Sequence, residues 1–303
     1  MACNHKKKKK ILSVGETSLF QCTNCLLVLN DKYKKGFDPK QIYTNYYRNE
    51  IAGRFVFSIE YIVRFFRFFR AFKVYTINPK ARSILDIGSG RGFMLYYLKK
   101  YYRYKTTVGT QIEKKSYEFS KNKLGLEIYN KDLLNISFKN RQFDLVTIWH
   151  VLEHVSRPEE YVIKIRKLLK TNGILVVEVP NFDSWTRAFA NKYWLGLDLD
   201  HHLFFFNKKT LISLLKKYGF KIKRAQTFSI EYSAFTSAQS IISLITKTDN
   251  IFFSSIQTGK FTPYIILHLA LFAFLFPICF LINILLYFSD KGEVVLVTAE
   301  KAA

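Results

Sequence analysis

Short apolar runs alternate with amphipathic segments across residues 83–225, and this alternation constrains the fold more than any other feature. Five runs rich in β-branched or apolar residues are expected as strands, over residues 83–87, 106–109, 126–129, 143–148 and 173–179. Strands separated by helical patterns predict a parallel sheet with helices on both faces. Two more strands are expected over residues 220–225 and 293–298. The sequence therefore predicts an α/β fold with a doubly wound sheet.

A glycine-rich turn follows the first of these strands. Residues 84–92 read Ile-Leu-Asp-Ile-Gly-Ser-Gly-Arg-Gly, and an amphipathic helix is expected over residues 93–102. Glycines let the backbone turn tightly and approach a ligand, and amides at a helix start suit an anionic group. A dinucleotide fingerprint needs two residues before its last glycine, whereas only Arg91 stands there. Taken alone, the pattern also fits an ordinary turn between a strand and a helix.

The glycine turn and the segments after it resemble class I S-adenosylmethionine-dependent methyltransferases. The turn is similar to motif I of that family, with Asp86 two residues before the first glycine. Residues 143–155, 169–181, 194–198 and 202–211 resemble the later motifs of the ubiquinone-biosynthesis-like branch. The resemblance spans residues 83–225 and the last strand. It implies a Rossmann-like sheet of seven strands whose last strand is antiparallel, with S-adenosylmethionine as cofactor.

The resemblance also implies a cofactor site. Its expected residues are Asp86, Gly88, Gly90, Gly92, Gln111, Asp132, Leu133 and His150. Gln111 stands where the family usually has an acid for the ribose hydroxyls, so either Gln111 serves or Glu113 takes its place. Ligands of open α/β sheets bind outside the carboxyl ends of the strands, so Asp86, Gln111, Asp132, His150 and Asn181 should converge on one crevice.

His150 and His202 are the candidate catalytic residues. An acceptor that must lose a proton needs a base, and imidazole titrates near neutral pH. Each histidine has an alternative interpretation as a packed, hydrogen-bonded residue. If the segment after the fourth strand is helical, His150, Glu153 and His154 share one face and could bind a divalent metal. Such Glu and His residues are more often structural caps or ion partners. Relatives often carry Arg where this chain has His201, so an anion-binding role there is in question.

Cysteines cluster near the N-terminus. Cys3 and His5 form one pair of possible ligands, and Cys22 and Cys25 form a second pair at a spacing typical of a zinc ribbon. The alternative is a set of buried or incidental thiols. The lysines of residues 6–10 are expected to lie in a solvated loop that touches anionic lipid.

Residues 264–288 contain no Asp, Glu, Lys or Arg over 25 positions. A straight helix of this length would rise about 37 Å, against a hydrocarbon core of about 30 Å. A single crossing would put the last strand on the wrong side of the membrane. Since Pro277 divides the run, we expect a helical hairpin that dips into the membrane and returns; a dimer interface or a buried helical pair are the alternatives. The basic and aromatic residues 63–73 suit either a lipid contact or a cover over the cofactor crevice.

These features divide the chain into five expected regions. They are a zinc-ribbon-like head over residues 1–31, a helical cover segment over 32–78, the methyltransferase core over 79–232, an apolar insertion over 233–291 with its membrane hairpin at 264–288, and the last strand and tail over 292–303. The basic start has no apolar stretch of signal-peptide length, so the cytoplasmic face of a membrane is the expected location.

The expected function is O-methylation of a membrane-associated small molecule or lipid-linked glycan. The net charge of +24 favours association with anionic partners, but it does not distinguish among lipid, nucleic acid and acidic substrates. An RNA methyltransferase is one alternative, although the sequence shows no RNA-binding module. A non-catalytic membrane scaffold with a decayed cofactor site is another, and Gln111 is the residue that favours it.

Overall fold

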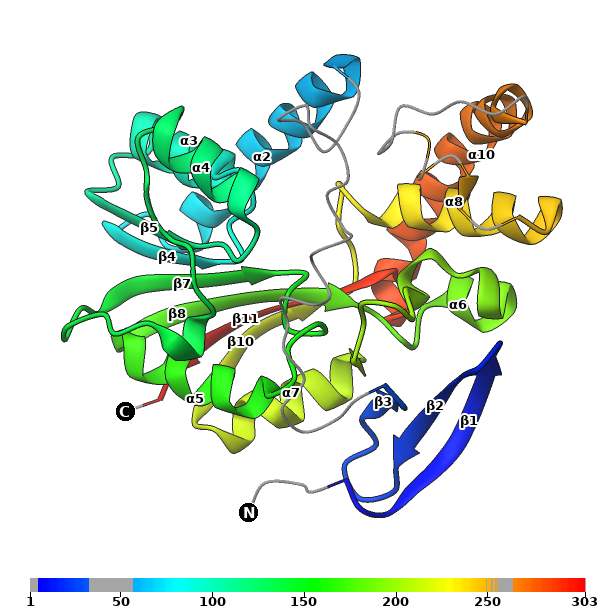
Figure 1. Ribbon diagram of the computed structural model, residues 1–303, viewed down its shortest axis with the longest axis horizontal. Coiled ribbons are helices and arrows are strands. Elements are labelled where there is room, and N and C mark those ends of the chain that lie inside the picture. Colours follow the sequence, from blue (N-terminus) through cyan, green and yellow to red (C-terminus); the bar gives the residue numbers. More distant parts are fainter. Residues whose placement is uncertain are drawn as a thin grey trace.

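A computed structural model describes residues 5–32, 57–248, 250–251, 253, 255 and 264–302. Figure 1 shows a central sheet with helices above and below it, a small N-terminal sheet to one side, and a layer of helices beyond one edge of the central sheet. Of the five expected regions, most of residues 32–56 and the ligand candidate Cys3 lie outside the described residues.

The central sheet has seven strands in the order β10-β11-β8-β7-β4-β5-β6. Their bounds are β4 (Ser83–Ile87), β5 (Thr106–Thr110), β6 (Glu127–Tyr129), β7 (Phe143–Trp149), β8 (Leu169–Pro180), β10 (Phe220–Gln226) and β11 (Val294–Lys301). β4, β5, β6, β7 and β8 pair in parallel, whereas β11 lies antiparallel between β8 and β10. The predicted α/β doubly wound sheet, its seven strands and the antiparallel last strand are therefore confirmed.

Helices cover both faces of this sheet. Above it in Figure 1 lie α2 (Phe57–Ile77), α3 (Phe93–Tyr101) and α4 (Lys114–Asn122), and below it lie α5 (Pro158–Leu168) and α7 (Lys208–Lys217). Every residue of β4 is buried, as expected for a strand covered on both faces. The apolar runs that predicted strands are thus the residues that form the core between the two helical layers.

The N-terminal head forms a separate small sheet. β1 (Lys8–Val14), β2 (Thr17–Cys22) and β3 (Val28–Asn30) are antiparallel neighbours, and β3 pairs with β9 (Phe204–Phe205) of the core. The Asn30 amide donates to the carbonyls of Leu199 and His202, at 2.8 and 3.0 Å. The head is therefore docked on the loop that carries His202. The lysines of residues 8–10 lie in β1, so their expected place in a loop is wrong.

The C-terminal helices form a layer at the right of Figure 1. They are α6 (Trp185–Ala190), α8 (Ser233–Thr246) and α10 (Ile265–Leu286), with short 3-10 turns at Asn191–Tyr193, Leu195–Leu197 and Tyr287–Ser289. Another 3-10 turn, Leu133–Asn135, follows β6 and contacts α5. α10 continues through Pro277, so the expected division into two hairpin arms is wrong. Proline removes one backbone donor, but an apolar helix packed along a neighbour retains its remaining hydrogen bonds.

Candidate functional site

The glycine turn forms the start of the site, between β4 and α3. Gly88, Gly90 and Gly92 all have positive φ angles, of 71, 55 and 74°. Residues with a Cβ atom adopt such angles only under strain. A Cβ on Gly88 would lie 2.3 Å from a methyl carbon of Val151. A Cβ on Gly90 would meet no atom within 4 Å. The turn is therefore packed tightly at Gly88 and open at Gly90, as a backbone cradle for a ligand requires.

Asp86 lies beneath this turn and is almost fully buried. Its Oδ1 accepts a hydrogen bond from the hydroxyl of Thr147 on the neighbouring strand β7, at 2.6 Å. Burial raises the pKa of Asp86 to about 6, although this hydrogen bond and the nearby Arg70 and Arg67 oppose the rise. The site therefore contains a carboxyl group that loses its proton close to neutral pH.

Gln111 directly follows β5, and its side chain supports the local chain. The Gln111 Oε1 accepts from the backbone N–H of Glu113 at 3.1 Å. Glu113 is the N-cap of α4, and its carboxylate accepts from the N–H groups of Lys115 and Ser116. Because the Glu113 carboxylate is occupied by this cap, Gln111 stays the candidate for the ribose hydroxyls.

Asp132 begins the turn after β6. One of its oxygens accepts from the N–H of Leu134 at 2.8 Å, and the other accepts from the Tyr161 hydroxyl of α5 at 2.5 Å. The Leu133 side chain is buried in the core, so only its backbone is available to a cofactor. Asn181, after β8, donates to the Gly292 carbonyl at 2.7 Å and thus ties the start of β11 to the sheet edge.

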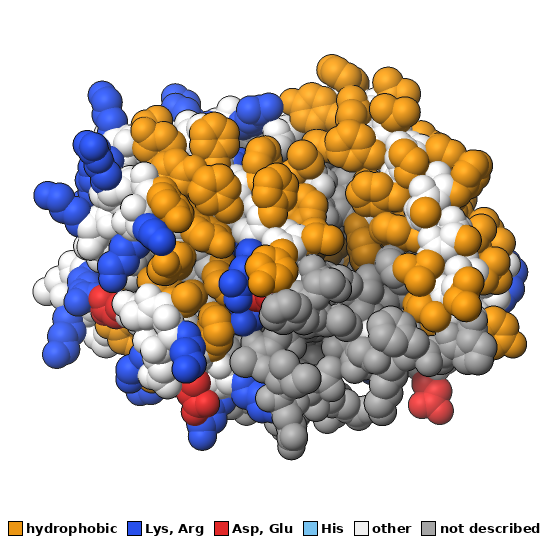
Figure 2. Space-filling model, turned by 90° about the horizontal axis from the view of Figure 1, so that it is seen from above, with side chains coloured by type: hydrophobic (Ala, Val, Ile, Leu, Met, Phe, Trp, Pro, Cys, Tyr) orange, Lys and Arg blue, Asp and Glu red, His pale blue; other side chains and the backbone are white. Residues whose placement is uncertain are grey.

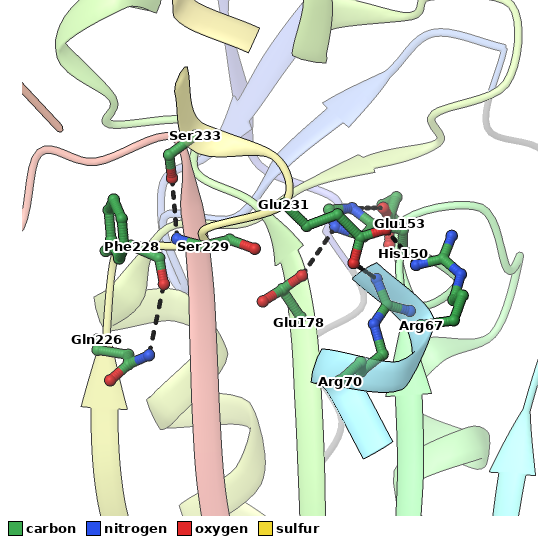
Figure 3. A network of polar contacts seen from close by, with 10 residues as sticks. All are labelled: Arg67, Arg70, His150, Glu153, Glu178, Gln226, Phe228, Ser229, Glu231 and Ser233. Atoms are coloured by element: carbon green, nitrogen blue, oxygen red, sulfur yellow. Dashed lines mark hydrogen bonds and ion pairs between the residues drawn. The ribbon is translucent and has the colours of Figure 1, made fainter. Parts of the chain in front are cut away.

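His150 follows β7 and lies between two buried carboxylates, as Figure 3 shows. Its Nε2 is 3.1 Å from the Glu178 Oε1, and its Nδ1 is 3.5 Å from the Glu153 Oε1. Burial would lower the pKa of His150, but the contacts with Glu153 and Glu178 outweigh it and raise the pKa to about 10. His150 is therefore a cation at neutral pH, and as an imidazolium it has no lone pair with which to act as a base.

Two arginines of α2 extend this cluster. Figure 3 shows Arg67 and Arg70 both directed at Glu231, in the loop between β10 and α8, and Arg70 is 2.5 Å from the Glu231 carboxylate. The next residue, Tyr232, places its ring 4.2 Å from that of His150. Burial and Glu231 would raise the pKa of Tyr232, but the three neighbouring cations outweigh them and lower it.

Sequence reasoning missed Glu178, Glu231, Tyr232 and the two arginines as site residues. One signal was present, because Glu178 is a single acid within the apolar strand β8. Such a residue needs a buried partner. Nothing local to residues 231–232 indicated that they would lie beside His150, since β10 is at the far edge of the sheet order.

A second group of donors lies beside His150. Glu153, His154 and His202 are all buried, and one ligand atom from each lies within 4.8 Å of the others. The Nδ1 atoms of His154 and His202 lie 3.0 Å from the backbone carbonyls of His201 and Gly196. Burial and His202 lower the pKa of His154 to about 4, so His154 is neutral. A divalent metal would therefore find Glu153, His154 and His202 together, whereas His150 directs its ring at two carboxylates. The segment at residues 151–154 is a turn, so the expected helical face is wrong.

The helix α2 covers the glycine turn. Glu60 of α2 accepts from Arg91, between Gly90 and Gly92, at 2.6 Å. Within the described part of the chain, buried polar atoms without a hydrogen-bond partner include Glu60 Oε2, Arg91 Nε and Glu178 Oε2. Unpartnered buried atoms of both charges suit a ligand that carries both an amino and a carboxylate group. The residues present at this edge therefore fit the expected cofactor.

A family comparison identifies the domain. The family model described as a methyltransferase domain matches residues 57–225, more than half of the chain. The chain belongs to the methyltransferase-domain family. S-adenosylmethionine is the cofactor of this family, so the expected class of enzyme and its cofactor are confirmed. The narrower likeness to the ubiquinone-biosynthesis-like branch stays a prediction.

Individual relatives of this methyltransferase are distant. The uncharacterized protein MJ1123 of Methanocaldococcus jannaschii is 25% identical over 151 residues, which are 49% of this chain and 69% of that protein. A SAM-dependent methyltransferase from Archaeoglobus fulgidus is similar in structure, with a TM-score of 0.51, 19% identity, and coverage of 78% of this chain and 94% of that one. The [4+2]-cyclase SpnF has a TM-score of 0.50, 16% identity, and coverage of 78% and 81%. These two structures share the fold.

The head of the methyltransferase brings three of its four predicted zinc ligands together. His5, Cys22 and Cys25 place their ligand atoms within 4.8 Å of one another, and the His5 Nδ1 is 3.5 Å from the Cys25 Sγ. Cys22 ends β2 and is fully buried. Two thiols and an imidazole are a donor set that suits zinc. The residues present therefore fit a structural zinc ion, and its binding stays a prediction.

Proposed function

We propose that this methyltransferase transfers the methyl group of S-adenosylmethionine to an oxygen of a membrane-associated small molecule or lipid-linked glycan, at the cytoplasmic face of a membrane. The observation that carries the proposal is the position of α10. Among the described residues, Ile265–Ser289 is the one helical segment long and apolar enough to cross a membrane, and most of it is exposed. α10 packs on α8, which begins directly after Tyr232, the residue whose ring contacts His150.

The main task of the protein in methyl transfer is to hold the acceptor oxygen, the methyl carbon and the sulfur in line. In a displacement at the sulfonium methyl, the acceptor oxygen forms the new O–C bond while the C–S bond breaks and S-adenosylhomocysteine leaves. S-adenosylmethionine supplies the methyl group, and holding the reactants in line is worth about 7 to 11 kcal/mol. The residues at the carboxyl ends of β4, β5 and β6 would hold the cofactor: the turn at Gly90, Gln111 and Asp132.

An acceptor hydroxyl must also lose its proton. His202 remains the candidate base, since its Nδ1 is oriented by the Gly196 carbonyl and its other nitrogen is the one left to accept a proton. His150, as a fixed cation beside Tyr232, would instead orient the acceptor and stabilise negative charge that develops on its oxygen. His150 is therefore proposed as a positioning residue, in place of the catalytic role expected for it.

Binding of the cofactor product tests the core of the proposal. Calorimetric titration of the purified, detergent-solubilised protein with S-adenosylhomocysteine is expected to show micromolar binding. Gly90→Arg fills the open space at the turn and should abolish it. Gly125→Arg is the matched control, because Gly125 also has a positive φ and open space around its Cβ position, but lies at the opposite end of the strands, before β6. Absence of binding by the wild-type protein would favour the scaffold.

Transfer of label to an acceptor tests the substrate class. The protein is incubated with S-adenosylmethionine labelled in its methyl group, and with either a membrane lipid extract or total RNA. Label in the lipid fraction, lost in Gly90→Arg, would support the proposal. Label in RNA would support the alternative suggested by the net charge. Methyl transfer itself must be measured, because the [4+2]-cyclase among the structural neighbours indicates that this fold also supports other reactions.

A further inference from the structure

The outer face of α10 is an apolar stripe. Its most exposed side chains recur along the whole helix, as at Leu267, Phe274, Leu281 and Leu285, and Phe274 and Leu285 are 68 and 69% exposed. Figure 2 shows hydrophobic side chains along this helix at the right of the face seen from above. A patch of this extent on a soluble surface indicates an interaction site.

The inner face of α10 is attached to α8 at both ends. The Asn283 amide donates to the Ser237 hydroxyl at 2.9 Å, and the His268 Nε2 lies 3.5 Å from the Thr248 hydroxyl, just beyond the end of α8. Polar residues of α8 such as Gln239 and Ser240 are buried in this layer. If α10 crossed a bilayer, α8 and its polar residues would have to enter the hydrocarbon as well, which is costly. α10 therefore lies flat on the protein, with one face outward.

The C-terminal end of α10 is fixed to the sheet. Lys208 and Asp290, four residues after α10, form an ion pair at 2.6 Å, and the Asn181 amide donates to the Gly292 carbonyl at 2.7 Å. β11 begins at Val294 between β8 and β10. Hence the chain returns to the catalytic domain within a few residues of the apolar helix.

A second apolar surface lies on α2. Phe65, Phe69 and Phe72 are exposed, and the ring of Phe68 lies 5.9 Å from that of Tyr101 at the end of α3. Figure 2 shows this second group of hydrophobic side chains on the same face as α10, with basic side chains at its margin. Lys99 and Lys100 lie at the exposed end of α3, and Arg103 follows just after the helix. Aromatic residues beside lysine and arginine are typical of a protein surface that contacts an anionic membrane.

One loop joins both surfaces to the crevice. Glu231 pairs with the α2 residues Arg67 and Arg70, Tyr232 packs on His150, and α8, which carries α10, starts at the next residue. The two exposed apolar faces are therefore both connected to His150 through residues 231–233.

We infer that α2 and α10 together rest on an anionic lipid bilayer, with α10 parallel to the membrane plane, so that the crevice receives its acceptor directly from the lipid. The inference rests on the proposed membrane-associated acceptor and adds the orientation of the enzyme and its second contact. The bilayer is favoured over a second copy of the chain. The exposed residues of α10 are uniformly apolar, whereas interfaces between soluble proteins have polar rims and hydrogen bonds, and the net charge is +24.

Tryptophan placed at chosen positions tests this orientation. Leu267→Trp, Phe274→Trp and Leu285→Trp sample both ends and the middle of α10, and Phe65→Trp samples α2. Ile163→Trp is the matched control, because Ile163 is also an exposed apolar residue but lies on α5, below the sheet. Each full-length protein is mixed with vesicles of phosphatidylcholine and phosphatidylglycerol, in which the lipids carry bromine either near the headgroup or near the chain ends. The emission lost relative to the wild-type protein reports the depth of each added indole.

A flat α10 predicts that its three tryptophans are quenched alike, mainly by the shallow bromines, and that Phe65→Trp is quenched too while Ile163→Trp is not. Strongest quenching of Phe274→Trp by the deep bromines would indicate a spanning helix and overturn the inference. Absence of quenching together with a dimer in light scattering would indicate a second copy as the occupant. S-adenosylhomocysteine titration of the same variants is independent: binding without quenching contradicts the orientation alone, and quenching without binding contradicts the proposed reaction alone.

The basic margin gives a second readout. Lys99→Gln and Lys100→Gln should each weaken binding to phosphatidylglycerol vesicles by about fivefold, since a lysine near an anionic surface contributes on the order of 1 kcal/mol. Lys167→Gln on α5 is the matched control and should change nothing. Equal effects of all three substitutions would mean that the total charge of the protein attracts the vesicle whichever surface a lysine lies on. That result would contradict the inference.

Discussion

The Nε2 of His150 lies 3.1 Å from the Oε1 of Glu178, at the carboxyl end of the sheet where β7 and β8 run side by side. This pair joins the residue expected to be a catalytic base to an acid within the neighbouring strand. It converts His150 into a half-buried cation and connects the cofactor edge of the sheet with Tyr232 and the helices beyond it.

The pair should make the protein sensitive to alkaline pH. The pKa of His150 is raised from 6.5 to about 10, so the native state binds this proton more tightly than the unfolded state. Its stabilising contribution is therefore complete below about pH 6.5 and disappears as the pH approaches 10. Thermal unfolding measured from pH 7 to pH 10 should show a falling melting temperature. His150→Gln should flatten this dependence; an unchanged slope would show that His150 is not the group responsible.

Removal of one partner from the pair should cost more than removal of both. His150→Ala leaves Glu178 and Glu153 buried without their cation, and an uncompensated buried charge costs about 3 to 5 kcal/mol. The double variant with His150→Gln and Glu178→Gln keeps two neutral side chains that can hydrogen-bond, and it leaves only the Glu153 carboxylate without its cation. Chemical denaturation should therefore find the double variant more stable than His150→Ala. The reverse order would mean that the pair has little effect on folding.

Asp86 should also lower the stability as the pH rises, but in a more acidic range than His150. Its pKa is raised from 3.8 to about 6 by burial, so the native state favours the protonated form, and stability from this group is lost as the pH rises from 4 to 6. The cost at neutral pH is on the order of 3 kcal/mol. Asp86→Asn should raise the melting temperature at pH 7.5 and have little effect at pH 4.5, while it weakens cofactor binding. Equal effects at both pH values would contradict the raised pKa.

Asn283 should be intolerant of charge although it lies in an apolar helix. Its amide donates to Ser237, which also donates to the buried carboxylate of Glu293 at 3.1 Å. Asn283→Asp has nearly the same shape but places a second carboxylate there, at a cost of about 3 to 5 kcal/mol. Asn283→Leu loses only hydrogen bonds, at about 1 kcal/mol each. Denaturant titration in detergent should therefore find Asn283→Asp much less stable than Asn283→Leu. Equal stabilities of the two variants would contradict the contact of Asn283 with Ser237 and Glu293.

The N-terminal head should carry one zinc ion per chain. Elemental analysis of the purified protein is the measurement, and Cys22→Ser or Cys25→Ser should remove the metal because each deletes a thiolate ligand. Cys279→Ser is the matched control, since Cys279 is a buried cysteine of α10 far from the head in sequence. Full zinc occupancy in Cys22→Ser would contradict the predicted ligand set.

The sequence by itself determined the central sheet. The central strands were predictable because each contains a short apolar run bounded by a turn, and burial on both faces leaves few alternatives for such a run; the edge strands β6 and β10 are more polar and more exposed. The glycine turn was predictable for a related reason, since positive φ angles at three alternate residues favour glycine at residues 88, 90 and 92. Both are local constraints, which a sequence records directly.

Only the tertiary structure decided what the charged residues do. His150 could be a base or a structural cation, and the choice depends on Glu178, 28 residues away, and on Tyr232 from the far edge of the sheet. Pro277 divided the apolar run in the sequence, yet α10 remains continuous because α8 supports it at Asn283 and His268. Charge states and helix orientations depend on neighbours that are distant along the chain. Local patterns record an individual residue's own preferences, whereas the pKa of a buried group and the exposed face of a helix are properties of the packed molecule.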